Sequence, residues 1–331
     1  MGVEALAGSS TDVVTTHWRG YSTPRDDTEV TFPREDVGKL GGTTRSYIGK
    51  TGGGITLQGD ATFEQLCYIF NSGIKHVDPT TDASSAQIRT WAVQNVSTDP
   101  ISTTDLDTLV FEDGDNQQAE IARYGFCTEI NLTGTEGGAL EVSAPYTTRA
   151  RATTTFTSIS DTDLDNACET ILFSNSYLYI DAASGSIGST QKSDTLLDMS
   201  LKFTTGWKAQ GTAGSGRKDF SFIKRVADEI MLEVTFEHNA TTVTEIAAWR
   251  NETERALRLK FTGSALSDTD AGAPYDTKAL VIDLYGKWQS FSGPEGQDGD
   301  NVCKGTFKVA YCATANAKAS FVIANEMSVL P

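Results

Sequence analysis

Residues 229–262 read EIMLEVTFEHNATTVTEIAAWRNETERALRLKFT and combine two strand patterns with one helix pattern. Over the first nine residues apolar and polar side chains alternate, which is the period of a strand with one buried and one wet face. Thr242 stands three residues before Glu245, the capping-box spacing, so we expect a short helix to begin there. The period returns to two over residues 257–262, which predicts a second strand.

The helix in this stretch is expected to bury one stripe of its surface. Val243, Ile246, Ala247 and Arg250 recur at helical spacing, with Trp249 beside them. Such a stripe would let the helix lie across an edge of a sheet.

The unit of strand, helix and strand has an earlier counterpart. Residues 55–73 read ITLQGDATFEQLCYIFNSG, again a strand pattern followed by a capping spacing, from Thr62 to Gln65. The two caps are 180 residues apart (242 minus 62), and the tetrapeptide DGDN recurs at an offset of 185 (298 minus 113). An ordered series of matches at a near-constant offset indicates internal duplication. We therefore predict two tandem copies.

The predicted organisation has three parts. Residues 1–46 are polar and rich in breakers, which predicts an irregular arm. Residues 47–151 would form the first repeat, and residues 152–331 the second, including a long loop at 204–219 that carries Trp207. Loops of that length usually have a function. Within the second repeat, residues 177–180 and 196–203 are expected to form a hairpin.

The composition favours a mainly β protein with a sizeable core. The chain has 331 residues, is 38% hydrophobic, and is rich in Thr, Ser and Gly. Its formal charge of -17 argues against binding nucleic acid by counterion release, although the acidity could equally serve solubility or a saline habitat. We find no apolar run long enough for a membrane span and expect no membrane association.

The residues that usually carry chemistry do not form a recognisable site. The five cysteines are scattered, without a CxxC pair, and are expected to be reduced core residues. Gly211 to Lys218 resembles a phosphate loop, but Arg217 stands in the lysine position and Asp219 would oppose phosphate. No GxSxG motif occurs, and the three histidines lack distinctive partners. We expect neither an enzyme nor a cofactor or metal site.

Several motifs resemble the major tail tube proteins of long, flexible, non-contractile-tailed (siphovirus-type) bacteriophages. The resemblance follows the order of elements over nearly the whole chain, and each motif is loose. Its motifs are WRG at 18–20, FPREDVGKL at 32–40, GDATFEQLCYIF at 59–70, FEDGDN at 111–116, LKFTTGW at 201–207, LEVTFEHNAT at 232–241, EIAAWR at 245–250 and FVIAN at 321–325.

The resemblance implies a fold, an assembly and a set of partners. Members have a tube domain of the β-sandwich type with a short flanking helix, and their inner sheets join into a β-barrel. Six such domains form a ring, and rings stack into a tube through which DNA passes. The implied partners are copies of the chain, the tail terminator, tape-measure and tail-tip proteins, and DNA in transient, non-specific passage. The protein would belong to the virion, in a tail assembled in the host cytoplasm.

Two sets of residues are candidates for contacts in such a tube. The duplication suggests that three chains form each ring, and six chains are the alternative. The polar face of one strand would make the lumen acidic, and an acidic lumen would repel DNA. Large aromatics supply much of the energy of protein interfaces. The candidates for contacts between rings are Trp18, Phe32, Trp207, Lys208 and Arg217. The candidates for the lumen are Glu229, Glu233 and Glu237.

Two other classes of function stay open on sequence grounds. The first is a different virion component, such as a capsid decoration or tail-tip protein, which would share the β structure and the acidity. The second is a carbohydrate-binding β-sandwich, which predicts a concave aromatic surface. Self-polymerisation separates the tail tube from both alternatives.

Overall fold

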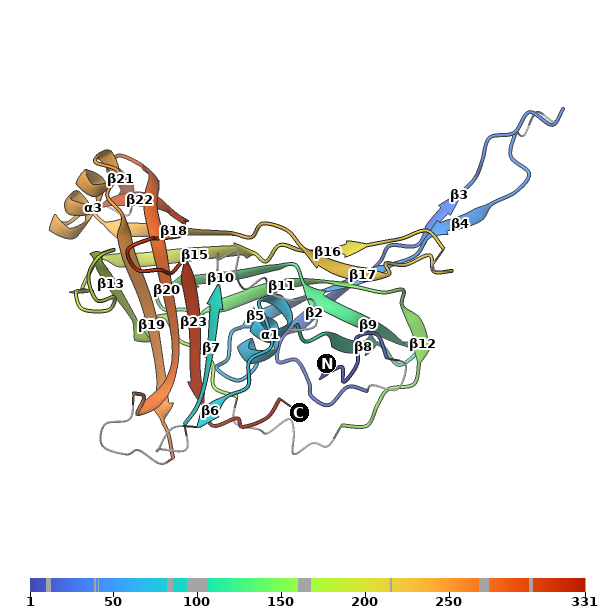
Figure 1. Cartoon of the computed structure of the whole chain (residues 1–331), viewed down its shortest axis with the longest axis horizontal. Coiled ribbons are helices and arrows are strands. Elements are labelled where there is room, and N and C mark those ends of the chain that lie inside the picture. Colours follow the sequence, from blue (N-terminus) through green and yellow to red (C-terminus); the bar gives the residue numbers. More distant parts are fainter. Residues whose placement is uncertain are drawn as a thin grey trace.

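A computed structural model of the chain has a mainly β fold, as the composition predicts (Figure 1). It describes residues 1–9, 13–38, 40, 42–81, 86–93, 106–159, 168–214, 216–267, 274–297 and 300–330. The described part holds two α-helices, α1 (Leu66–Gly73) and α3 (Ala240–Arg250), and a single 3-10 turn, η2 (Phe173–Asn175). The acidic tracts at 161–165 and 268–270, and the second DGDN turn at 298–299, lie outside the described residues.

The largest layer, sheet 1, is antiparallel and runs across Figure 1. Seven strands follow one another across this sheet, and each is hydrogen-bonded to the next. From one edge to the other they are β2 (Tyr21–Asp26), β5 (Gly53–Asp60), β11 (Glu141–Thr148), β10 (Glu129–Thr135), β15 (Leu196–Thr204), β18 (Glu229–Glu237) and β22 (Asp300–Val309).

A second layer, sheet 2, runs nearly vertically in Figure 1. Its strands are β6 (Thr80–Thr81), β7 (Gln87–Val93), β23 (Ala319–Asn325), β20 (Thr277–Phe291), β19 (Arg255–Ala265), β13 (Ser176–Ala182) and β14 (Gln191–Lys192). The two sheets are joined through β20. Its first half pairs with β19 and β23, and its second half pairs with β22 of sheet 1.

Smaller elements extend this frame. Strands β1 (Gly2–Val3), β8 (Leu109–Gly114), β9 (Ala119–Cys127) and β12 (Ala152–Thr154) form a side sheet, which meets sheet 1 where β9 pairs with β11. Strand β21 (Glu295–Gln297) pairs with the start of β22. Two hairpins leave the body, β3 (Glu29–Thr31) with β4 (Tyr47–Lys50), and β16 (Trp207–Gln210) with β17 (Phe222–Arg225).

The two sheets enclose one main core. The apolar residues that alternate along β18 are buried, as the sequence predicts, and face the inner side of sheet 2. Phe203 of β15 stacks on Phe321 of β23, with ring centroids 5.7 Å apart, so side chains of the two layers meet directly. Phe70 of α1 contacts the same Phe321 and also Trp91 of β7. Helix α1 is thus packed inside the sandwich, and all of its residues are buried.

The first helix starts later than predicted, at Leu66 with Gln65 as its N-cap and without a side-chain cap, although the predicted contact between Thr62 and Gln65 forms in the turn before it. The Thr62 Oγ1 accepts a hydrogen bond from the backbone N–H of Gln65 at 3.1 Å, which is one half of a capping box. The Gln65 side chain turns elsewhere and donates to the carbonyl of His17 at 2.7 Å. It thereby ties the N-terminal segment to the helix.

The second helix starts earlier than predicted. Its N-cap is Asn239, whose Oδ1 accepts from the backbone N–H groups of Thr241 and Thr242, and the Thr242 hydroxyl donates to the Glu237 carbonyl. The predicted cap at Thr242 is therefore wrong, because Asn239, an equally good cap, stands first in the chain.

The predicted buried stripe of α3 is also wrong. Val243 is 53% exposed, while Thr242, Glu245 and Ala248 are buried. Glu245 can be buried because its Oε2 accepts from the Nε of Arg255 at 3.0 Å and from the indole N–H of Trp288 at 2.9 Å. A hydrophobic periodicity cannot reveal a buried carboxylate of this kind.

Two further predictions are corrected by the strand pairing. Strands β13 and β15 exist as expected but are not a hairpin, because β13 pairs with β14 and β19 while β15 pairs with β10 and β18. Residues 1–46 are not an irregular arm throughout. Their described part contributes β1 and β2 to the body, and the projecting segment begins after β2.

The two predicted repeats share a single core. Strand pairs β10–β15 and β7–β23 cross from residues 47–151 to residues 152–331, and the main hydrophobic cluster contains side chains from both ranges. Internal duplication stays a prediction, and each predicted repeat is completed by strands of the other.

Candidate functional site: a projecting arm and a polar sheet face

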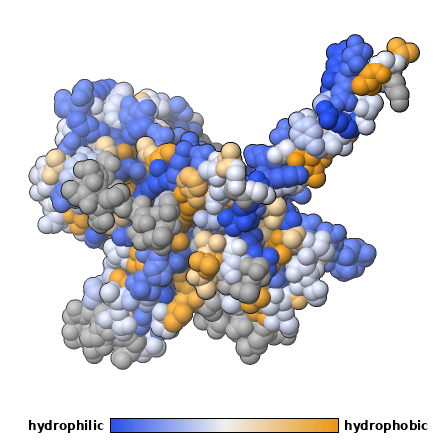
Figure 2. All heavy atoms as spheres, turned by 45° about the vertical axis from the view of Figure 1, so that its right-hand side comes forward, coloured by the Kyte–Doolittle hydropathy of each residue, from blue (hydrophilic) through white to orange (hydrophobic). Residues whose placement is uncertain are grey.

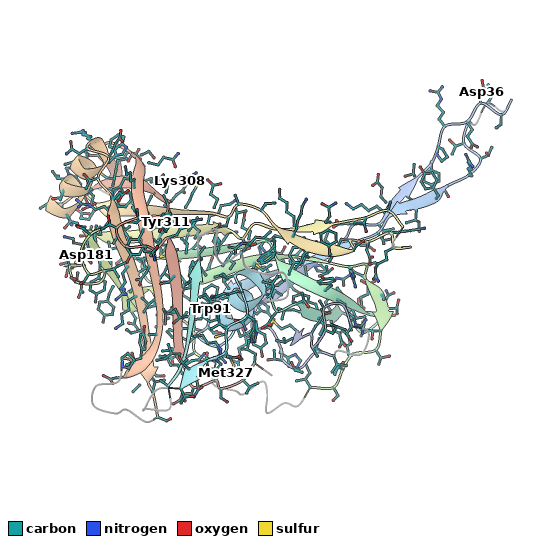
Figure 3. The ribbon with its side chains drawn as sticks, in the orientation of Figure 1. Asp36, Trp91, Asp181, Lys308, Tyr311 and Met327 are labelled. Atoms are coloured by element: carbon teal, nitrogen blue, oxygen red, sulfur yellow. The ribbon has the colours of Figure 1, made fainter. Side chains whose placement is uncertain are left out.

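The arm, residues 27–52, is a hairpin that projects from the body (Figure 1). Strands β3 and β4 pair antiparallel, and at the base the N–H of Asp27 donates to the carbonyl of Gly52 at 3.0 Å. Near the tip, labelled by Asp36 in Figure 3, Glu35 binds Arg45 in an ion pair and accepts from the hydroxyl of Thr44. Hydrogen bonds and ion pairs therefore hold the arm as a hairpin.

The arm exposes an unusual share of apolar side chains. Six of the seventeen exposed large hydrophobic residues in the described chain lie on it. They are Val30, Phe32, Val37, Leu40, Tyr47 and Ile48. Figure 2 shows orange, hydrophobic spheres along the hairpin and at its tip. Burying six such side chains would be worth on the order of 10 kcal/mol. That is comparable with the roughly 4–15 kcal/mol that association costs.

The second hairpin, β16–β17, supports the base of the arm. The N–H of Thr51 donates to the carbonyl of Lys218 at 3.0 Å, so the two hairpins touch there. Arg217, a predicted contact residue, lies exposed in the same turn and pairs with Asp219 at 2.8 Å. The structure thus brings Arg217 close to the base of the arm that carries Phe32, which is 65% exposed.

Trp207 is not an exposed residue of this loop. Its side chain is 2% exposed and packs with Phe126, Phe220 and Ile223, while its indole N–H donates to the carbonyl of Gly73 at 2.9 Å. It therefore anchors the hairpin to the end of α1, and its side chain is not available for a surface contact. The sequence pattern showed the tryptophan but not that its ring would be buried among these residues.

The other two predicted contact residues lie apart from the arm. Lys208 follows Trp207 on β16 and is exposed. Trp18 is half-buried against the core, and its indole N–H donates to the carbonyl of Gln58 at 3.0 Å. Whether either residue contacts another chain stays a prediction.

The outer face of sheet 1 is mainly polar, with Tyr21 and Met231 as its large apolar side chains on β2 and β18. Glu229 and Glu233 are exposed and Glu237 is half-buried, and all three point away from the core, as the alternation along β18 predicts. Lys308 pairs with Glu229, and its hydrogen bond lowers the pKa of that carboxyl. Neighbouring strands add the following outward side chains: Glu129, Asn131, Thr133, Glu141, Ser143, Ser200, Lys202 and Lys304. Acidic and basic groups are therefore interspersed on this face.

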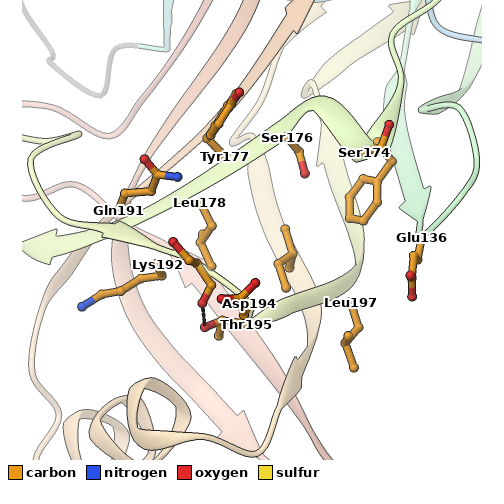
Figure 4. A pocket seen from close by; sticks show the side chains of 13 residues that line it. Glu136, Ser174, Ser176, Tyr177, Leu178, Gln191, Lys192, Asp194, Thr195 and Leu197 are labelled. Atoms are coloured by element: carbon orange, nitrogen blue, oxygen red, sulfur yellow. Dashed lines mark hydrogen bonds between the residues drawn. The ribbon is translucent and has the colours of Figure 1, made fainter.

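A shallow cavity of about 480 Å³ lies between β13, β14 and the start of β15 (Figure 4). Leu178 forms part of its apolar wall, and the hydroxyl of Thr195 donates to the carbonyl of Ser193 at 2.8 Å. Lys192 points outward in this view. Neither a histidine nor a cysteine is among the residues that line this cavity.

Metal and thiol chemistry find little support in the described residues. None of their His, Cys, Asp and Glu side chains gather in groups of three or more that could hold a metal ion. All five cysteines are free, and four are buried, which confirms that they are not paired. Burial raises the pKa of the Cys67 thiol to about 12, so it stays protonated at neutral pH.

Comparison with known proteins gives no family. The chain matches no model of a known protein family, and a search of curated proteins returns no match. Neither helix in the described part of the chain has the length and apolar character needed to cross a membrane.

Proposed function

We propose that the chain is a structural protein of a bacteriophage tail, which assembles with copies of itself into the tail tube. The observation that carries this proposal is the arm, a hairpin that leaves the body and displays six large apolar side chains. Contiguous exposed apolar surface on a soluble protein is typical of an interaction site. The kind of assembly, a tube of stacked rings, is the one implied by the resemblance of the sequence motifs to tail tube proteins.

The outer face of sheet 1 supports the same proposal. A broad, polar face with few large apolar side chains suits the wall of a water-filled channel. Its carboxylates would weaken DNA adhesion within about 8 Å at physiological salt. Strand β2 forms one edge of this sheet and pairs only with β5 among the described strands. A free edge is where the sheet of a neighbouring chain can continue the ladder.

An arm on one side of the molecule implies a particular symmetry of contact. The arm has to meet a different surface of the next copy, which is a heterologous contact, and such contacts generate rings or filaments. We propose rings of three chains, because the predicted duplication would supply six tube domains. Rings of six chains are the alternative.

Electron microscopy of the purified chain at high concentration tests the proposal. The wild-type chain should form tubes, and the double variant Phe32→Ser with Leu40→Ser should not, while its thermal unfolding stays unchanged. The matched control is Val243→Ser, since Val243 is 53% exposed on α3 and lies outside the arm. This control should form normal tubes.

Each outcome has a distinct meaning. A wild-type chain that remains a small oligomer at all concentrations would contradict the tail-tube proposal and favour a decoration or tail-tip protein. Tubes with six complete chains in each ring would contradict the three-chain version alone.

A further inference from the structure

Arg89 of β7 is a fully buried cation with few hydrogen-bond partners. It lies on the inner face of sheet 2 and is 1% exposed. One terminal nitrogen, Nη1, donates to the Oδ1 of Asn325 at 3.5 Å, at the outer limit of a hydrogen bond. Its Nε is buried without a partner, and no carboxylate of the described residues forms an ion pair with it. Among the described residues, this guanidinium therefore has no carboxylate within ion-pair distance.

A buried guanidinium without an ion-pair partner lowers the stability of the fold unless another group balances its charge. A buried charge without a partner destabilises a fold far more than a paired one, which is why such groups are rare. A leucine or methionine would fill the same space in the sandwich without that cost. The presence of an arginine on the inner face thus calls for a partner at ion-pair distance that the described residues do not supply.

A cavity of about 150 Å³ lies beside this arginine. Arg89 lines it together with Asn71, His76 and two carboxylates, Asp78 and Asp107. Val77, Pro79 and residues near both ends of the described chain complete the wall. A water molecule occupies about 30 Å³ of liquid, so this space is large enough for a small ligand together with a few waters.

Both acidic groups in the cavity wall contact His76. Asp78 lies 3.3 Å from its Nε2 and is largely exposed, whereas Asp107 is the more buried of the two. Both oxygens of Asp107 lie within 3.0 Å of the Nδ1 of His76, and one of them also accepts from the Nδ2 of Asn71 at 2.8 Å. The Asn71 Oδ1 in turn accepts from the indole N–H of Trp91 at 2.8 Å. Asp107 is thereby oriented toward His76 and Asn71, and it forms no ion pair with Arg89.

The rim of the cavity holds a titratable group, His76. Burial by itself would lower the pKa of His76, but its hydrogen bond to Asp107 and the charges of Asp107 and Asp78 outweigh that effect and raise it. When His76 is protonated, its charge and that of Arg89 together balance the two carboxylates of the wall.

We propose that this cavity binds a small oxyanion, a carboxylate or a phosphate, with Arg89 as its anchoring cation. A guanidinium presents a planar fork of N–H donors, and two oxygens on one atom match that fork in a bidentate pair. The amide of Asn325 keeps the guanidinium in place on its other side. This site is independent of the arm, because none of the residues that line the cavity belongs to residues 27–52.

A thermal-shift titration tests the proposal. Sodium acetate and sodium phosphate would be titrated into the full chain, with sodium chloride at matched ionic strength as the reference. The unfolding temperature should rise saturably with at least one oxyanion, by about 5 °C at a hundredfold excess over Kd, because a ligand of the native state stabilises it. Which anion gives the rise identifies the source, a carboxylate or a phosphate.

Two variants show whether Arg89 is responsible. Arg89→Met should lose the rise and, without anion, be at least as stable as wild type, because the buried charge without an ion-pair partner is gone. The control Arg255→Met removes a guanidinium that is paired with Glu245, so it should lower stability but keep the rise. A wild-type chain that responds to neither oxyanion, or an Arg89→Met chain that still responds, would overturn the proposal. The wild-type titration decides the matter even if a variant fails to fold.

Discussion

Strand β18 and the hairpin of β3 and β4 are similar in local sequence but differ in what covers them. In β18 the apolar side chains Ile230, Leu232, Val234 and Phe236 are all buried against sheet 2. In the arm no second layer of described residues lies over the hairpin, so its apolar side chains stay in water. Alternating apolar residues along a strand thus show that one face of the strand is apolar. Whether another layer of the same chain buries that face depends on the fold.

The largest difference between the two regions is expected when one phenylalanine in each is replaced by alanine. Phe236→Ala should lower the free energy of unfolding by about 3–5 kcal/mol, because it removes a ring from a packed core. Phe32→Ala should change it by less than about 0.5 kcal/mol, since this residue is 65% exposed. Denaturant unfolding of both variants measures the difference. Equal losses would mean that the arm packs on its own body in solution.

The β16–β17 hairpin gives a second test, since it reaches the arm but is anchored in the body. Trp207→Phe keeps an aromatic ring but leaves the buried carbonyl of Gly73 without its indole donor, which should cost about 1–3 kcal/mol. Tube formation should survive. Lys208→Ala, next in sequence and exposed, is the control and should leave stability unchanged. A stable Trp207→Phe chain that cannot assemble would restore Trp207 as a contact between chains.

The start of α3 offers a smaller effect within the body. Asn239→Ala removes the side chain that caps two backbone N–H groups and should cost about 1 kcal/mol. Thr244→Ala, on the exposed surface of the same helix, should cost less than about 0.5 kcal/mol. Thermal unfolding compares the two. The reverse order would contradict the assignment of Asn239 as the cap.

The smallest expected effect is a dependence of stability on pH at His76. Its pKa in the folded chain is raised above the usual 6.5, so its contribution is complete below pH 6.5 and is lost as the pH rises through the folded value. The side chain is 47% exposed, which keeps the effect below about 1 kcal/mol. His76→Gln should remove this part of the pH dependence in denaturant titrations. An unchanged profile would show that Asp107 does not stabilise the protonated ring.

The sequence pattern predicted those features that depend on neighbours along the chain. It predicted the mainly β class, the two faces of β18, the hydrogen bond between Thr62 and Gln65 ahead of α1, and the unpaired cysteines. These follow from period, spacing and composition. It failed for the partners of β13 and β15, because the period of a strand does not specify which strand lies beside it.

The candidate sites show the same limit. Phe32 was identified because an aromatic residue in a polar segment needs cover, but the other apolar residues of the arm were hidden among breakers. The burial of Trp207 was not predicted, because the ring packs on Phe126 of β9 and donates to the carbonyl of Gly73, both far from it in sequence. Arg89 gave no signal, since its meaning depends on a cavity that forms only when β7, α1 and β23 pack together.

Sedimentation of the intact chain against a chain without its arm tests the central claim most directly. Because Asp27 and Gly52 are already hydrogen-bonded at 3.0 Å, residues 29–50 can be replaced by two glycines without straining the body. The intact chain should sediment as ever larger assemblies as its concentration rises, and the shortened chain should remain monomeric with the same unfolding temperature. A shortened chain that assembles to the same extent as the intact one would contradict the claim that the arm joins one copy to the next.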